Sequence, residues 1–145
     1  MAFRAMCFVL GPGVDAEDLK KRTQRDFPGL LVQVANSRDL RNEALVELIA
    51  WQTRAARAAG CLLAKTPQMD MLLRIAGTTQ IAKAIRNSGA RKGEENLLII
   101  AGELRELERF HIGGSVAAER LGKGRLNEGE RVRLEKAAML NALRG

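Results

Sequence analysis

Aromatic residues are scarce in this sequence, which has four Phe, one Trp and no Tyr, only 3% of the chain. Proteins that hold single-stranded nucleic acid on a stacking platform need more aromatic side chains than this, so that mode of binding is disfavoured. The hydrophobic core must instead be built from aliphatic side chains.

Metal-ligating and thiol side chains are equally few. Two cysteines, Cys7 and Cys61, cannot form a disulfide scaffold or a four-cysteine zinc site. His111 is the single histidine, which is too few for most histidine-based metal sites, and no metal or cofactor is expected. We interpret His111 as a surface or loop residue, and both cysteines as small buried hydrophobic residues.

Long hydrophobic runs are missing as well. No apolar run approaches the roughly 18 residues that a membrane-spanning helix needs. The apolar start, Met1–Leu10, is too short for the hydrophobic region of a signal peptide and ends at Gly-Pro-Gly. We therefore expect a cytoplasmic protein in a reducing compartment, with no membrane partner.

The chain does have enough apolar residues for one core. Its 145 residues are 46% hydrophobic, which is typical of a globular protein and argues against disorder. Neither an internal repeat nor a long linker divides the sequence. We therefore expect a single domain over residues 1–145.

Apolar periodicity and turn residues predict an α/β fold, a single compact domain with a small mixed β-sheet flanked by helices. The predicted strands cover Phe3–Leu10, Leu30–Ala35 and Asn96–Ala101. Ser115–Leu121 fits either a short edge strand or a turn of helix. The predicted helices cover Ala16–Arg25, Arg38–Ala59, Pro67–Ile75, a segment from Thr78 or Thr79 to Asn87, Glu103–Phe110 and Glu130–Leu143.

The formal net charge of the chain is +7, and this excess of positive charge is confined to one third of the sequence. Asp70 is the only acid between Arg54 and Lys92, so this segment carries the whole excess and the remainder is neutral. A segment that lacks its own counter-ions predicts an anionic partner, with nucleic acid the first candidate. Its basic residues are Arg54, Arg57, Lys65, Arg74, Lys83, Arg86, Arg91 and Lys92.

The spacing of these cations supports a shared surface. Lys83 and Arg86 lie three residues apart on one face of a predicted helix, and Arg54 and Arg57 repeat that spacing. Lysine and arginine bind phosphates through charge-assisted hydrogen bonds, so we interpret the segment as a phosphate-binding surface. The alternative is an ordinary solvated face.

One motif suggests an enzyme. Gly11–Ala16 has the form G-x-G-x-x-A between a predicted strand and a predicted helix, which is the context of a dinucleotide-binding turn. However, Asp15 and Glu17 would place negative charge where a pyrophosphate must lie, so a simple turn is preferred. No other residues form a catalytic constellation, which favours a binding protein over an enzyme. A small dinucleotide-binding enzyme is the less favoured alternative.

One segment resembles a family motif. It runs from Asp70 to Ile81 (DMLLRIAGTTQI), continues with Ala82–Ile85 and Gly89, and precedes the apolar strand Leu97–Ile100. The order is an acid, apolar residues, Ala-Gly, two residues, Gln-Ile, Ala-Ile and a glycine. This segment resembles the core motif of the kinase-binding subunit of the KEOPS complex (the TPRKB family, archaeal type), and the similarity covers Leu30–Gly102.

The resemblance implies a compact α/β sheet flanked by helices and a non-catalytic role. It implies a tRNA-binding subunit of the complex that makes threonylcarbamoyladenosine in tRNA. In that family the subunit binds the small kinase-like ATPase subunit and engages tRNA, including its single-stranded acceptor end. The alternative is a protein-only regulator of a kinase-like ATPase, whose basic surface meets an acidic partner.

The motif adds two residues to the candidate RNA surface. Gln80 stands at the glutamine of the motif, and Thr79 stands where many archaeal members carry arginine. The amide of Gln80 offers a donor and an acceptor to base edges or ribose hydroxyls, whereas its alternative role is to cap a loop beside Gly77. The predicted tRNA-binding residues are Arg54, Arg57, Lys65, Arg74, Thr79, Gln80, Lys83, Arg86, Arg91 and Lys92.

The last predicted helix has too many apolar positions for one narrow stripe. Some of them are therefore expected to stay exposed, and an exposed apolar patch commonly marks a protein interface. The alternative is that both faces of this helix are buried against the sheet. The candidate partner-binding residues are Leu134, Ala138, Met139 and Leu143.

Overall fold

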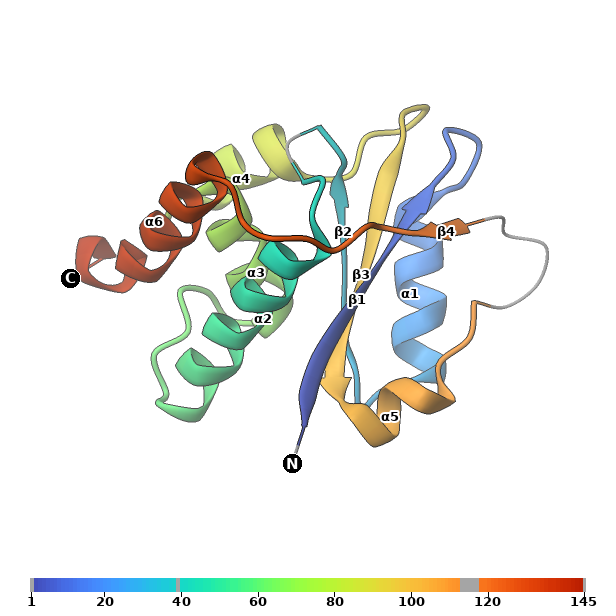
Figure 1. The fold of residues 1–145 in the computed structure, drawn as a ribbon, viewed down its shortest axis with the longest axis horizontal. Helices are drawn as coiled ribbons and strands as arrows, with labels where there is room; N and C mark the ends of the chain where they lie inside the picture. The colour runs from blue at the N-terminus through green and yellow to red at the C-terminus, as the bar shows by residue number, and fades with distance from the viewer. Residues whose placement is uncertain (1, 39, 113–117, 145) are drawn as a thin grey trace.

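A four-stranded sheet with the strand order β2-β3-β1-β4 runs through the centre of the molecule (Figure 1). The computed structural model describes residues 2–38, 40–112 and 118–144. The strands are β1 (Phe3–Leu10), β2 (Leu31–Asn36), β3 (Asn96–Glu103) and β4 (Ala118–Arg120). The helices are α1 (Ala16–Asp26), α2 (Glu43–Ala58), α3 (Pro67–Ala76), α4 (Ile81–Ser88), α5 (Leu104–Arg109) and α6 (Glu128–Arg144).

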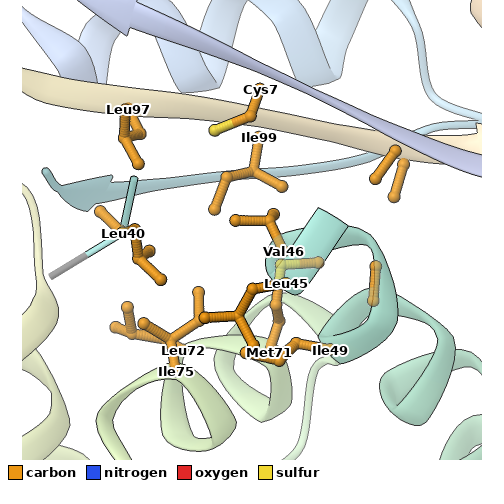
Figure 2. Close-up of a cluster of buried hydrophobic side chains, with 14 of the residues drawn as sticks. Cys7, Leu40, Leu45, Val46, Ile49, Met71, Leu72, Ile75, Leu97 and Ile99 are labelled. Atoms are coloured by element: carbon orange, nitrogen blue, oxygen red, sulfur yellow. The ribbon is translucent and has the colours of Figure 1, made fainter. Parts of the chain in front are cut away.

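β3 is the buried centre of this sheet, and its alternate side chains enter two separate cores. Leu97 and Ile99 pack with the apolar faces of α2 and α3, while Leu98 and Ile100 pack with α1 and α5. Figure 2 shows the larger core, where Leu97 and Ile99 point from the sheet towards these helices. Both faces of the sheet are therefore covered by helices, as the apolar run of β3 predicts.

The prediction of a single α/β domain is confirmed, but the sheet is not mixed. The three ladders of the described strands are all antiparallel. The reason lies in the helical hairpin of α2 and α3, which carries the chain away from the end of β2 and back again (Figure 1). β3 therefore starts beside the end of β2, with Asn96 opposite Asn36, and runs in the reverse direction.

Capping residues explain why two helices begin at other residues than the apolar periodicity of the sequence predicts. α2 begins five residues later than predicted because Asn42 is its N-cap and accepts the Ala44 N–H at 3.0 Å. α6 begins at Glu128, where Asn127 and Glu130 exchange two hydrogen bonds. The segment Ser115–Leu121 contains the short edge strand β4, and its residues 115–117 lie outside the described residues.

Two carboxylates attach α2 to the edge of β1. Glu43 accepts the backbone N–H of Cys7 at 2.9 Å, and Glu47 accepts that of Ala5 at 3.0 Å. Arg120 in β4 donates two hydrogen bonds to Glu43, at 2.6 and 2.8 Å. These contacts satisfy backbone donors at an edge that β4 does not reach, and they fix the position of α2.

The single-residue predictions have mixed outcomes. Cys7 is buried as predicted, but Cys61 is exposed because it lies in the loop after α2, so its predicted burial is wrong. His111 is exposed, at an edge contact with Phe27. Across the described parts of the chain, no helix combines the length and apolar character needed to cross a lipid bilayer.

Candidate nucleic-acid interface

Arg74 does not lie on the surface. Its side chain is only 2% exposed, and its guanidinium donates to both carboxylate oxygens of Asp70, at 2.8 and 3.2 Å. It also donates to the carbonyl of Ala137 at 3.0 Å and to the side chain of Asn141 at 2.8 Å. The prediction that Arg74 contacts tRNA is therefore wrong, because its donors are used inside the protein.

Asp70 organises this buried network. Besides Arg74, its carboxylate accepts the hydroxyl of Thr53 at 2.7 Å and the N–H of Leu63 at 2.9 Å. The network joins α2, α3 and α6, and each carboxylate oxygen has partners, as a buried charge requires. The spacing of Asp70 and Arg74, four residues apart on one helix, is the sequence signal that could have revealed the pair.

The surface keeps the whole excess of positive charge, because the buried pair is neutral. The other cations of the segment, however, separate into two groups. Arg54 donates a hydrogen bond to Glu103 at the end of β3. In contrast, the carbonyl of Asn87, in the last turn of α4, accepts a hydrogen bond from Asn36, which lies opposite the start of β3. An eight-residue strand spans roughly 26 Å, and Figure 1 shows α4 and the α2–α3 loop at opposite ends of the helical layer.

The first group comprises Arg54, Arg57 and Lys65. The Nη2 of Arg54 donates to Glu103 at 2.9 Å, so the charge of this arginine is already balanced. Arg57 in the last turn of α2 and Lys65 in the α2–α3 loop are both exposed. This group therefore offers two free cations and one paired cation.

The second group comprises Lys83, Arg86, Arg91 and Lys92 and is called the α4 cluster below. Lys83, Arg86 and Lys92 are exposed, while Arg91 is partly buried and donates to the carbonyl of Arg86 at 2.8 Å. No acid occurs between residues 71 and 93. The α4 cluster therefore presents three exposed cations from a segment that contains no acid.

The acids that follow the α4 cluster are already paired with other cations. Glu94 lies 3.4 Å from Arg38, and Glu95 lies 3.5 Å from Arg41. Both arginines come from the segment between β2 and α2, and they are the counter-ions of these two carboxylates. Glu94 and Glu95 therefore form their ion pairs with Arg38 and Arg41 and not with the α4 cluster.

Thr79 and Gln80 lie at the start of α4, and both are exposed. Gln80 is the N-cap residue of α4, yet its side chain makes no capping hydrogen bond. The hydroxyl of Thr78 accepts the N–H of Gln80 at 3.1 Å, which closes the turn before α4. Gly77 ends α3 with a φ of +71°, a left-handed conformation that suits glycine. The amide of Gln80 is thus turned to solvent at one end of the α4 cluster.

The expected partner-binding patch on α6 is only partly as predicted. Met139 is 59% exposed and Leu143 67% exposed, and Ala138 is also exposed. Leu134 is instead half-buried against the larger core, so its assignment to an exposed patch is wrong. Val132, 57% exposed, completes the outward stripe in its place.

The turn Gly11–Ala16 has the wrong surroundings for a dinucleotide. β1 and β2 run in the same direction, but β3 lies between them, so the turn does not lead into the two adjacent parallel strands of a dinucleotide-binding unit. Gly11 and Gly13 do not adopt positive φ angles, and the carboxylate of Asp15 accepts the N–H of Asp18 at the start of α1. A cavity of about 450 Å³ lies beside this turn, and its wall carries Asp15 and Glu17 together with Arg91 and Lys92, so the charges of the lining cancel.

Comparison with models of protein families and with curated proteins found no match for this chain. The resemblance to the kinase-binding subunit therefore depends on the motif residues themselves. In the described residues, no group of three side chains suited to metal binding occurs.

Proposed function

We propose that this chain is a non-catalytic, tRNA-binding subunit of a KEOPS complex in the cytoplasm. In this role it binds the kinase-like ATPase subunit and the acceptor end of tRNA, and so supports threonylcarbamoyladenosine modification. The α4 cluster is the observation that carries the RNA-binding part of the proposal. The motif Asp70–Ile81, which leads directly into α4, carries the assignment to KEOPS.

The geometry of the α4 cluster suits an RNA backbone. Lys83 and Arg86 project from one short helix, and Lys92 follows in the next turn, so several phosphates of one strand can be neutralised together. Gln80 at the start of the same helix adds a group that can read a base edge or a ribose hydroxyl. Exposed Ile81 and Ile85 supply apolar surface beside these polar groups.

The deciding experiment reverses the charge of the α4 cluster. The double variant Lys83→Glu/Arg86→Glu should weaken tRNA binding by at least about tenfold at moderate salt, because two charge-assisted contacts become repulsive. Fluorescence anisotropy with intact tRNA and with tRNA lacking its terminal CCA measures the affinity and the contribution of the acceptor end.

The matched control is Lys21→Glu/Arg25→Glu, which changes the net charge equally on the exposed side of α1, across the sheet. This control should lose far less affinity than the α4 variant. Equal losses in the two variants, or normal binding by the α4 variant with an unchanged circular dichroism spectrum, would refute the α4 cluster as the RNA surface.

A protein-only regulator is the second candidate, favoured by the outward stripe of Val132, Met139 and Leu143 on α6. An apolar stripe of this kind is typical of a protein interface. If tRNA binding is absent while the chain still binds the kinase-like subunit, this candidate replaces the first.

A further inference from the structure

A cavity of about 720 Å³ lies where β1 begins and β3 ends. Its walls come from α2, the start of α3 and the loop between α1 and β2. Leu31, Ala58 and Pro67 supply accessible apolar surface, and Pro28 borders the cavity from the loop. The size of this cavity lies in the range of sites that hold small organic molecules, and its lining is part apolar and part polar.

Arg54 is held rigidly in the wall of this cavity. Its Nη2 donates to Oε1 of Glu103 at 2.9 Å. Its guanidinium carbon lies 4.9 Å from the ring centroid of Phe3 and 5.1 Å from that of Trp51. These contacts fix the guanidinium before any ligand arrives. Since Glu103 also lines the cavity, these two opposite charges balance each other.

Arg57 gives the cavity its net charge. It lies one helical turn after Arg54, lines the same cavity and is exposed. Only Arg54, Arg57 and Glu103 are charged among the lining residues, so the lining carries one net positive charge. Within the described part of the chain Arg57 forms no ion pair. Its guanidinium is therefore available to an anion.

The start of α3 adds to the same electrostatic preference. Pro67 and Gln68, the first two residues of this ten-residue helix, line the cavity. The N-terminal end of a helix carries a partial positive charge and favours anions. The C-terminal end of α2, at Arg57 and Ala58, carries the opposite partial charge, so the guanidinium of Arg57 is the main source of positive potential in the cavity.

We propose that this cavity binds a small organic anion with an apolar body. The apolar body packs against Leu31, Ala58 and Pro67, and the anionic group, such as a carboxylate or a sulfonate, pairs with Arg57. The site lies at the opposite end of β3 from the α4 cluster, so it is independent of the proposed RNA binding.

Two naphthalene dyes test the two halves of this proposal with the full-length protein. 1-Anilinonaphthalene-8-sulfonate has a planar body and one anionic group, whereas N-phenyl-1-naphthylamine has the same rings without the sulfonate. Fluorescence titration should show that the native protein binds the sulfonate about five- to tenfold more tightly, as one charge-assisted contact predicts. Inorganic sulfate, which lacks the apolar body, should compete only weakly.

Two pairs of variants locate the binding. Arg57→Gln should remove the preference for the sulfonate, whereas Arg109→Gln, also an exposed arginine in the last turn of a helix, should keep it. Ala58→Trp should fill the cavity and weaken both dyes, while Ala55→Trp, on the same helix but outside the cavity, should not. Equal affinity for both dyes, or unchanged binding in Arg57→Gln and Ala58→Trp, would overturn the proposal.

Discussion

At the scale of single residues, burial decides which arginines of the basic segment are free to bind a ligand. Arg74 and Arg86 have the same side chain and stand twelve residues apart. Arg74 lies inside because α3 is enclosed by α2, α4, α6 and β2, and Asp70 stands one turn before it. Arg86 projects from α4 into solvent. A count of arginines in the sequence therefore overstates the number on the surface by one, because Arg74 is buried with Asp70.

The stability of the fold should depend on Arg74. Arg74→Met should lower the free energy of unfolding by about 3 kcal/mol, because the carboxylate of Asp70 stays buried without a balancing charge. Urea denaturation followed by circular dichroism measures the change. Arg86→Met is the control and should leave the midpoint unchanged. A midpoint for Arg74→Met equal to that of the native protein would contradict the structural role.

The two cysteines should react very differently. Burial, and then the negative charge of Glu43, raises the pKa of the Cys7 thiol to about 12, so at pH 8 it remains protonated as well as inaccessible. Cys61 is exposed. Ellman's reagent should label one thiol rapidly in the native protein and two in denaturant, and Cys61→Ser should abolish the rapid phase. Rapid labelling of the native Cys61→Ser variant would contradict this assignment.

At the scale of secondary-structure elements, α6 separates its structural face from its outward face. Ala137 and Leu140 are buried against the domain, while Val132, Met139 and Leu143 face solvent. The inner face is also held by polar contacts, since Gln52 donates to the carbonyl of Leu134 at 3.1 Å. Substitutions on the outward face should therefore leave the attachment of α6 intact.

The outward face of α6 is where we expect the kinase-like subunit to bind. Met139→Arg should abolish co-purification with that subunit, because a charge placed in an apolar interface must be desolvated without a partner. The variant should keep its fold and its tRNA affinity. Arg131→Ala, an exposed position on the flank of the same helix, is the control. If the Met139→Arg variant still forms a stable complex, the kinase-like subunit binds a different surface.

At the scale of the whole molecule, local patterns predict the elements but not how they come together. The apolar run of β3 and the Gly77 break are visible in the sequence, so these boundaries are predicted to within a few residues. Strand direction is not visible, because it depends on the α2–α3 hairpin that returns the chain to the end of β2. The split of the basic residues has the same origin, since that hairpin carries Arg57 and the α4 cluster to opposite ends of β3. The cavity beside Arg57 joins five separate segments, which no spacing rule brings together.

This separation makes the salt dependence of tRNA binding a measure of how much of the molecule the RNA covers. For single-stranded RNA, the slope of log affinity against log salt is about −0.7 for each phosphate neutralised. Contact with the four cations of the α4 cluster alone should give a slope of roughly −3. The variant Lys83→Glu/Arg86→Glu should halve that slope, and Lys21→Glu/Arg25→Glu should not change it. A slope near −4 that also falls in Arg57→Glu/Lys65→Glu would show that the RNA reaches both ends of β3, and a flat response would favour the protein-only regulator.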